Sequence, residues 1–387
     1  MHQILRFFYN SYYNMNKVSK LFAIFIGFIL LTFNSLANES HGHEAHQEGE
    51  HTESHSEHGP INTPEKINAY IKHHLQDAHH FIFFTDGETG KHYGFSLPVI
   101  LWDGGIHMFS ASKFEHEIEV VESNGNFYVL YHDKIYKTDS EGKIELDHHG
   151  HPTNAKPLDI SITKSVVGML LAGLLMVWFF GSLAKSYKKG PVPTGLGRAL
   201  EPLVIYVRDE IARPNIGEHK YKKFMPYLLT VFFFIWILNL LGMTPLGFNV
   251  TGQIAVTFGL AIFTFIIVQF SANKSYWGHI FWMPGVPVPM KIILAPIEVL
   301  GMFTKPFSLM IRLFANITAG HFVMMSLIAL MIVLKNSFGP VGSTGMSLVL
   351  SLFIMLIEVL VAFLQAFIFT MLSSLFIGMA VADHDHH

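Results

Sequence analysis

Arg312 is a permanent cation inside a stretch, Ile292–Val333, that is otherwise apolar. An arginine at the centre of a membrane helix costs roughly 2.5–3.5 kcal/mol, and its guanidinium cannot lose a proton to avoid that cost. We therefore expect the side chain to face other protein groups or water, where it can pair with a carboxylate but cannot relay a proton. The alternative is a structural ion pair inside a helix bundle.

Other polar side chains on the same segment have the spacing of a helix face. Ser308 and Asn316 lie four residues before and after Arg312, so a helix places all three on one face. Glu298 lies about four turns earlier, roughly 20 Å along the axis at 1.5 Å per residue. His321 follows nine residues after the arginine and points to nearly the opposite side, so we expect it to make a different contact.

A second apolar segment, Met346–Val381, carries Glu358 and Gln365 two turns apart on one face. Both side chains are expensive in lipid. Two such helices are expected to pack their polar faces against each other or around water. A cation, an acid and an imidazole would then share one membrane interior.

These segments resemble the a subunit of rotary ATP synthases. The resemblance rests on the strings PFSLMIRLFANITAGH (306–321) and LQAFIFT (364–370), with weaker support from NLLGMTP (239–245). It covers about residues 160–382. It implies a stator that conducts protons past a rotating ring of c subunits, each with a membrane-buried carboxylate. The other implied partners are peripheral-stalk b subunits, the remainder of the complex and membrane lipids, with no nucleic acid and no cofactor.

The resemblance also assigns roles to individual positions. Arg312 matches the arginine that displaces the proton from an arriving ring carboxylate and blocks leakage between two half-channels. The other matched positions are polar residues beside the arginine (Asn316 and Gln365), a pair lining the inlet half-channel (His321 and Glu358) and the border of the outlet path (Glu298 and Ser308).

The pair His321 and Glu358 departs from some family members, which carry the acid on the first helix and the histidine on the second. The exchange keeps one acid and one base at the mouth of the same path. Histidine, with an ordinary pKa of about 6.5, relays protons near neutral pH. The alternative is that both are solvated polar residues in a bundle cavity. Because the ring carboxylate lies on another polypeptide, proton and sodium coupling both stay open, with protons as the default.

Composition indicates a membrane protein, since 50% of the residues are hydrophobic and only 14% are charged. The sequence predicts an all-α polytopic protein preceded by a small exported β-rich domain. The last two apolar blocks exceed the usual 20-residue span, so we expect two long helices that are strongly tilted or bent. The predicted blocks are Ile162–Phe180, Met225–Leu241, Gln253–Phe270, Ile292–Val333 and Met346–Val381.

The loop between the first two blocks is rich in lysine and arginine, which predicts a cytoplasmic location. Counting crossings from this loop places the start of the mature chain outside and the C-terminus in the cytoplasm. The family resemblance implies that the membrane is a bacterial inner membrane. Within the loop, Gly197–Ala212 has apolar residues at helical spacing, as expected for a helix along the membrane surface.

The N-terminal region predicts three further units before the proton-channel domain at 156–387. Residues 1–37 have the pattern of a signal peptide, with an uncleaved anchor as the alternative and Met15 as an alternative start. Residues 38–80 are histidine-rich and favour a mostly disordered linker over a weak metal-binding tract. Residues 81–155 show short aromatic and β-branched runs separated by Asp-Gly and Asn-Gly pairs, which predict hairpins.

Two other functions compete with the stator. The histidine tract, with His321 and Glu358, suggests a membrane metal-ion transporter, yet no His-x-x-x-[Asp/Glu/His] pair occurs inside the apolar blocks. A structural or assembly factor would use its polar residues only to hold the bundle together. The sequence has no phosphate-binding loop, so we expect a non-catalytic subunit that does not hydrolyse ATP itself.

Overall fold

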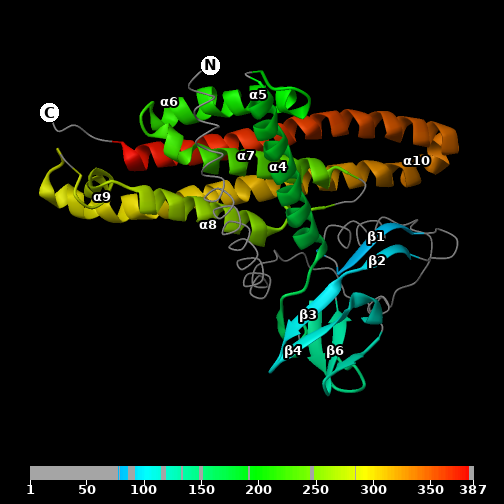
Figure 1. The fold of residues 1–387 in the computed structure, drawn as a ribbon. Coiled ribbons are helices and arrows are strands. Elements are labelled where there is room, and N and C mark those ends of the chain that lie inside the picture. Colours follow the sequence, from blue (N-terminus) through cyan, green and yellow to red (C-terminus); the bar gives the residue numbers. More distant parts are fainter. Residues whose placement is uncertain are drawn as a thin grey trace.

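The computed structural model describes residues 77, 79–85, 92–114, 119–131, 134–147, 151–190, 192–244, 248–283 and 285–382. The predicted signal segment and nearly all of the histidine-rich linker lie outside the described residues. In the described part, a strand-rich region precedes a region of long helices, and the two occupy different parts of the molecule (Figure 1).

The strand-rich region is built from short antiparallel sheets. Their orders are β1-β2, β4-β3-β8 and β5-β6-β7. Most strands lie in the region predicted to form hairpins, residues 81–155, but the last strand, Leu158–Asp159, lies beyond its predicted end. The strands are β1 (His80–Thr85), β2 (His92–Ser96), β3 (Pro98–Trp102), β4 (Ile106–Ser110), β5 (Val121–Ser123), β6 (Asn126–Tyr131), β7 (Lys134–Thr138) and β8 (Leu158–Asp159), with a 3₁₀ turn at Ala111–Phe114.

Turn chemistry and a small apolar core explain this arrangement. Asn124 and Gly125, with φ of 51° and 82°, form the turn between β5 and β6, and both angles lie in the left-handed region that such tight hairpins require. The inner faces of β3 and β6 bury Leu101, Tyr128 and Leu130 completely or nearly so. The alternation of buried and exposed residues along β3 and β4 is that of sheets with one covered face.

The helical region holds the segments predicted to cross a membrane. The helices are α4 (Lys164–Lys189), α5 (Leu196–Tyr206), the π-helical segment η2 (Val207–Ala212), α6 (Arg213–Ile216), α7 (Tyr221–Gly242), α8 (Ile254–Ser271), α9 (Lys274–Phe281) and α10 (Val288–Val381). Within the described residues, five segments are long and apolar enough to span a membrane: Lys164–Lys188, Tyr221–Gly242, Ile254–Ser271, Val288–Gly320 and Thr344–Val381. They coincide with the five predicted blocks, as expected for a polytopic membrane protein.

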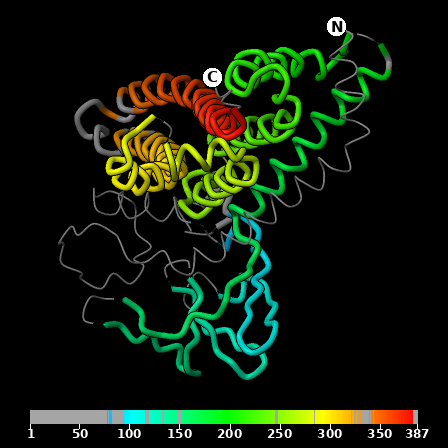
Figure 2. Tube along the Cα trace, turned by 90° about the vertical axis from the view of Figure 1, so that its left-hand side faces the viewer, coloured from blue at the N-terminus to red at the C-terminus, as the bar shows by residue number. Residues whose placement is uncertain are grey.

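The helix α10 is folded back on itself at Gly339, whose φ of 69° and ψ of 170° interrupt the helix. We call residues 288–338 the first arm and residues 340–381 the second arm. Both views show the arms running side by side (Figures 1 and 2). The Ser347 hydroxyl donates to the carbonyl of Leu327 across the pair at 2.8 Å. The two long C-terminal helices of the prediction are therefore an antiparallel pair.

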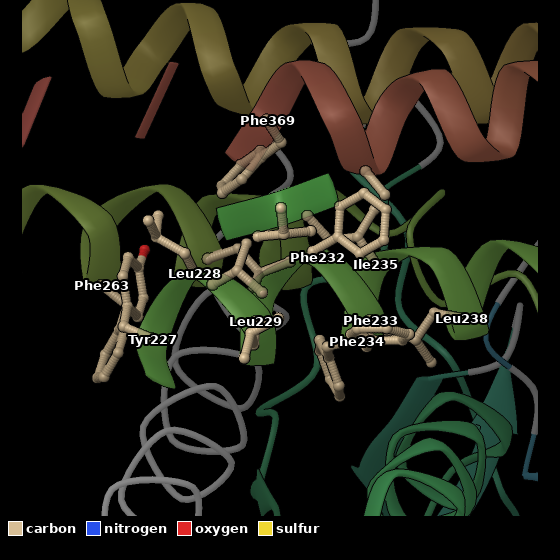
Figure 3. Close-up of a cluster of buried hydrophobic side chains, with 14 of the residues drawn as sticks. Tyr227, Leu228, Leu229, Phe232, Phe233, Phe234, Ile235, Leu238, Phe263 and Phe369 are labelled. Atoms are coloured by element: carbon tan, nitrogen blue, oxygen red, sulfur yellow. The ribbon is translucent and has the colours of Figure 1, made fainter. Parts of the chain in front are cut away.

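The core of the helical region is centred on α7. Phe232, Phe233, Phe234 and Leu238 are almost completely buried there (Figure 3). The ring of Phe232 meets that of Phe363 on the second arm at 5.8 Å. Because lipid is as apolar as these side chains, it is close packing, more than exclusion of water, that holds such helices together.

The strand-rich region is joined to the helices by polar and aromatic contacts. The carboxylate of Asp77 accepts a hydrogen bond from the backbone N–H of Ser165 in the first turn of α4, at 3.0 Å. His79 and Asp159 pair at 3.3 Å, and burial, which would raise the pKa of Asp159, is outweighed by His79 and Ser161, so that this pKa is lowered. Phe81 contacts the ring of Phe248 in the α7–α8 connection.

The predicted surface helix at Gly197–Ala212 is helical, formed by α5 and the π-helical segment η2, and it continues into α6. The carbonyl of Ile211 accepts the Ser374 hydroxyl of the second arm at 2.9 Å. Nearby, the last carbonyls of α10 are held from two sides. Lys220 and Asn273 both donate side-chain hydrogen bonds to the carbonyl of Val381, at 2.7 and 3.0 Å.

Candidate functional site

The face of the first arm that carries Arg312 is not covered by the described part of the chain. Arg312, Ser308 and Asn316 are all exposed, as the four-residue spacing predicted. On the neighbouring face of the same turns, about 60° and 100° around the helix from Arg312, Leu309 and Leu313 are buried at 2% and 1% exposure. A single helix therefore presents a cation and two polar groups outward while its other face packs on the bundle.

Gln365 lies directly behind Arg312, on the second arm, and is buried. Its side-chain nitrogen donates to the backbone carbonyls of Arg312 at 3.3 Å and Leu313 at 2.9 Å. Its oxygen accepts a hydrogen bond from Asn239 of α7 at 3.1 Å. The structure thus brings Gln365 to the arginine, as predicted, but to its backbone and not to its exposed guanidinium side.

Glu358 is a buried carboxylate, 7% exposed, on the second arm. It faces Gly320 of the first arm so closely that a Cβ atom at position 320 would lie 2.9 Å from its Oε1. Among the described residues its Oε2 has no hydrogen-bond partner. Gly320 directly precedes His321, whose side chain lies outside the described part of the structure. The fold therefore places Glu358 beside the backbone next to the predicted histidine.

Glu298 lies near the other end of the first arm and is partly buried. Burial and, secondarily, the negative charge of Glu298 raise the pKa of Tyr276 on α9. Tyr276, Gln269 and Lys305 line a small cavity between α8, α9 and the first arm. Sequence reasoning assigned no role to Tyr276 and Gln269, because their helices come together with the first arm only in the folded chain.

The polar groups therefore fall into two sets on either side of Arg312. Glu298 precedes the arginine by fourteen residues, about 21 Å of helix, and Gly320 follows it by eight, about 12 Å. Along the first arm, Arg312 lies between Glu298, which is near Tyr276, and Gly320, which is beside the buried Glu358. Within the described residues, no group of three or more His, Cys, Asp or Glu side chains could hold a metal ion.

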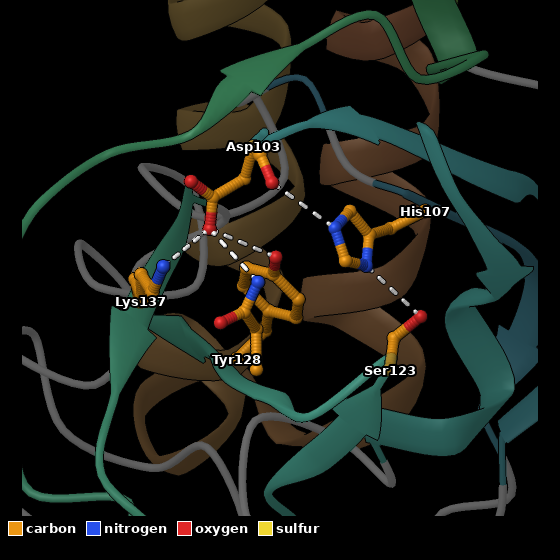
Figure 4. Close-up of polar contacts among 6 residues, drawn as sticks. Asp103, His107, Ser123, Tyr128 and Lys137 are labelled. Carbon is orange, nitrogen blue, oxygen red and sulfur yellow. Dashed lines mark hydrogen bonds and ion pairs between the residues drawn. The ribbon is translucent and has the colours of Figure 1, made fainter. Parts of the chain in front are cut away.

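A separate polar cluster in the strand-rich region links its sheets (Figure 4). Asp103, in the turn between β3 and β4, accepts hydrogen bonds from Lys137 at 2.7 Å and the Tyr128 hydroxyl at 3.1 Å. His107 bonds to Ser123 and to the backbone carbonyl of Asp103, both at 3.2 Å. The hydrogen bond from Lys137 is the main cause of a lowered Asp103 pKa, while burial and Asp103 raise the pKa of Tyr128 to about 12. These contacts stabilise the region.

Comparison with known proteins gives two family matches. A family model described as "ATP synthase A chain" matches residues 166–378, more than half of the chain. A second, described as a domain of unknown function, matches residues 70–160 and so spans all of the described strands.

Curated relatives carry the same designation. The chain is 46% identical over 254 residues to ATP synthase subunit a 2 of Chlorobaculum tepidum, covering 64% of this chain and 69% of that protein. It is 41% identical over 314 residues to ATP synthase subunit a of Chloroherpeton thalassium, covering 75% and 89%. Neither match supports a metal-ion transporter. With five apolar helices, the arginine-bearing arm and these matches, the chain belongs to the ATP synthase A chain family.

Proposed function

We propose that Arg312 separates two proton half-channels in this chain, which is the proton-translocating stator subunit of an F-type ATP synthase. The observation that carries the proposal is the exposed guanidinium on an otherwise apolar arm. Phe307 and Ile311 on the same uncovered surface are 57% and 43% exposed. A charge at such a surface is expected to face another protein or water within the membrane, and a carboxylate of a partner would pair with it.

The partner we propose is a ring of c subunits with one buried carboxylate each. When a protonated carboxyl group reaches Arg312, the fixed positive charge stabilises its ionised form, so the proton leaves to one side. Since the guanidinium stays protonated, it cannot pass a proton from one side to the other. Asn316, one turn away on the same exposed face, would donate hydrogen bonds to the same carboxylate.

We assign the inlet to Glu358 with His321 and the outlet to Glu298 with Ser308. Gly320 leaves room for the Glu358 carboxylate between the arms, at the point where the chain enters His321. An acid and an imidazole can exchange a proton near neutral pH, which suits an inlet. At the opposite end Glu298 offers an acceptor, and the cavity beside Lys305 lies next to it on the same arm.

The proposed orientation follows from charge and helix length. The lysines and arginines of the α4–α7 connection face the cytoplasm, as does the C-terminus, and the strand-rich region is exported. The spans of 33 and 38 residues in α10 correspond to roughly 50–57 Å of helix. A hydrocarbon core is about 30 Å thick, so both arms would be tilted beside the ring. Peripheral b subunits complete the stator in a bacterial inner membrane, and ATP chemistry lies in other subunits.

The test is ATP-driven acidification of inverted membrane vesicles carrying Arg312→Ala, with the assembled complex quantified. We expect pumping to be abolished at normal assembly. Arg198→Ala is the matched control, since Arg198 is an exposed arginine on α5 and belongs to neither arm. Full pumping by Arg312→Ala at equal assembly would contradict the half-channel assignment and leave the arginine with a structural role only.

A further inference from the structure

A line of buried hydrogen bonds crosses the bundle and ends on the backbone of Arg312. The hydroxyl of Thr251, before α8, donates to the Oδ1 atom of Asn239 at 2.8 Å. The Nδ2 atom of Asn239 donates to the Oε1 atom of Gln365 at 3.1 Å. Gln365 in turn donates to the carbonyls of Arg312 and Leu313. Three helical segments and one loop are thereby connected by side chains far apart in the sequence.

All three side chains of this line are inaccessible to water. Thr251, Asn239 and Gln365 are 2%, 2% and 3% exposed, among apolar neighbours. A buried amide that loses its partner has no water to replace it, so each bond in the line constrains the next. The hydrogen bonds all run in the same direction. The amides of Asn239 and Gln365 each accept a bond on the side of Thr251 and donate on the side of Arg312.

This line is suited to fixing geometry and not to moving protons. The Gln365 side-chain nitrogen donates to two backbone carbonyls, and its oxygen accepts a hydrogen bond from Asn239. Amide and hydroxyl groups do not titrate near neutral pH. A helix carbonyl has a second lone pair, so the carbonyls of Arg312 and Leu313 accept these bonds without losing their helical ones.

The turn held in this way is the one whose outer side carries the guanidinium. Leu313, whose carbonyl accepts from Gln365, is 1% exposed, while Arg312, one residue earlier and about 100° around the helix, is exposed. A helix fixed at two successive carbonyls cannot rotate or slide at that turn without breaking buried bonds. We propose that Thr251 and Asn239, acting through Gln365, are positioning residues that set the place of Arg312; the proposal rests on the proposed role of that arginine.

The experiment compares variants that remove bonds from the line with little change in shape. Thr251→Val deletes the first link, Asn239→Leu deletes both links that Asn239 makes, to Thr251 and to Gln365, and Thr251→Ser keeps the hydroxyl. Thr257→Val is the matched control, because Thr257 is equally buried but donates to the carbonyls of Gln253 and Ile254 near its own position. The readout is the ratio of proton pumping to ATP hydrolysis in inverted vesicles, at equal assembly and over a range of pH.

We expect Thr251→Val to lower this ratio by roughly two- to tenfold, the range that one buried hydrogen bond controls, and Asn239→Leu to lower it at least as far because it removes two bonds. Thr251→Ser and Thr257→Val keep the wild-type ratio. The double variant falls less than the product of the single effects, since both links belong to one line. The pH profile keeps its shape, because no proton carrier is removed.

Three outcomes would overturn the proposal. Wild-type ratios in Thr251→Val and Asn239→Leu would show that the line of hydrogen bonds does not determine the position of Arg312. A shifted pH profile would show that the line is part of the proton path. A ratio in Thr251→Ser as low as in Thr251→Val would show that the hydroxyl of Thr251 is not responsible for the effect. If Asn239→Leu fails to assemble, the ratio measured for Thr251→Val alone still tests the proposal. Loss of pumping in Arg312→Ala together with normal link variants would reject this inference alone and keep the proposed function.

Discussion

The helix α7 and the two arms of α10 are all strongly apolar, yet the fold surrounds them differently. Within the described fold, 72% of the most apolar window of α7 is buried, against 11% and 17% in the two arms. Their mean hydropathies of 2.1, 1.4 and 2.7 do not follow that order. Hydropathy thus identifies segments that leave water, but not whether protein or lipid replaces it. α7 is the scaffold, and the arms are the surface left for a partner.

The largest effect that tests this comparison is expected at Phe232 of α7. Phe232→Ala removes a ring that is completely buried, which costs about 3–5 kcal/mol in tightly packed interiors. Phe353→Ala on the second arm removes a ring that is 61% exposed in this chain, and should leave the thermal stability of the isolated chain nearly unchanged. Equal losses of stability in detergent for the two variants would show that the scaffold and the surface are not distinct.

A smaller effect, on transport, is expected where the arms touch. Gly320→Ala places a Cβ atom 2.9 Å from the Glu358 carboxylate, which must shift. We expect slower proton pumping with normal assembly. The control is Gly301→Ala on the first arm, since no atom lies within 4 Å of a Cβ built there. If both variants pump equally well, the contact between Gly320 and Glu358 has no role in the inlet, and only the outward face of the arms carries function.

The smallest effect concerns the strand-rich region, which depends on ordinary polar contacts. The hydrogen bond from Lys137 lowers the Asp103 pKa, so the bond stabilises the fold above the ordinary carboxylate pKa of about 3.9. The stabilisation is lost as the pH falls through the lowered value. Because the pair is partly exposed, we expect Asp103→Asn to cost less than about 1 kcal/mol at pH 7.

Hydrogen exchange of the β3–β4 hairpin in the full chain measures that effect, with each variant compared with wild type at the same pH. The exposed Glu122→Gln is the control. The difference between Asp103→Asn and wild type should shrink as the pH is lowered towards 3. A difference that grows on acidification would contradict the assigned sign.

The parts of the fold that depend on local patterns could be predicted from the sequence. Runs of apolar residues located the five spans, and the spacing of Ser308, Arg312 and Asn316 predicted their common exposed face. The Asn124-Gly pair correctly located a hairpin turn. Such features depend on neighbours within a few residues, and the sequence displays them directly.

The parts that depend on distant contacts could not be predicted. Gln365 was expected beside the arginine in the ion path, but only the fold shows that its amide is occupied by two backbone carbonyls. Asn239 occurs in a motif of the family resemblance without an assigned role, and nothing in the sequence connects it to Thr251. The contact of Gly320 with Glu358 likewise depends on how the arms fold back at Gly339.

The double attachment at the end of α10 has a mechanical consequence. The last turn of a helix ordinarily frays, because its carbonyls have no partners within the helix. Here Lys220 and Asn273 hold the carbonyl of Val381 from two separate segments. A sideways force on the arms cannot be absorbed by unwinding that turn and is passed on to the connections before α7 and α9. The end of the second arm is thus anchored to two other segments of the chain and is not a free helix end.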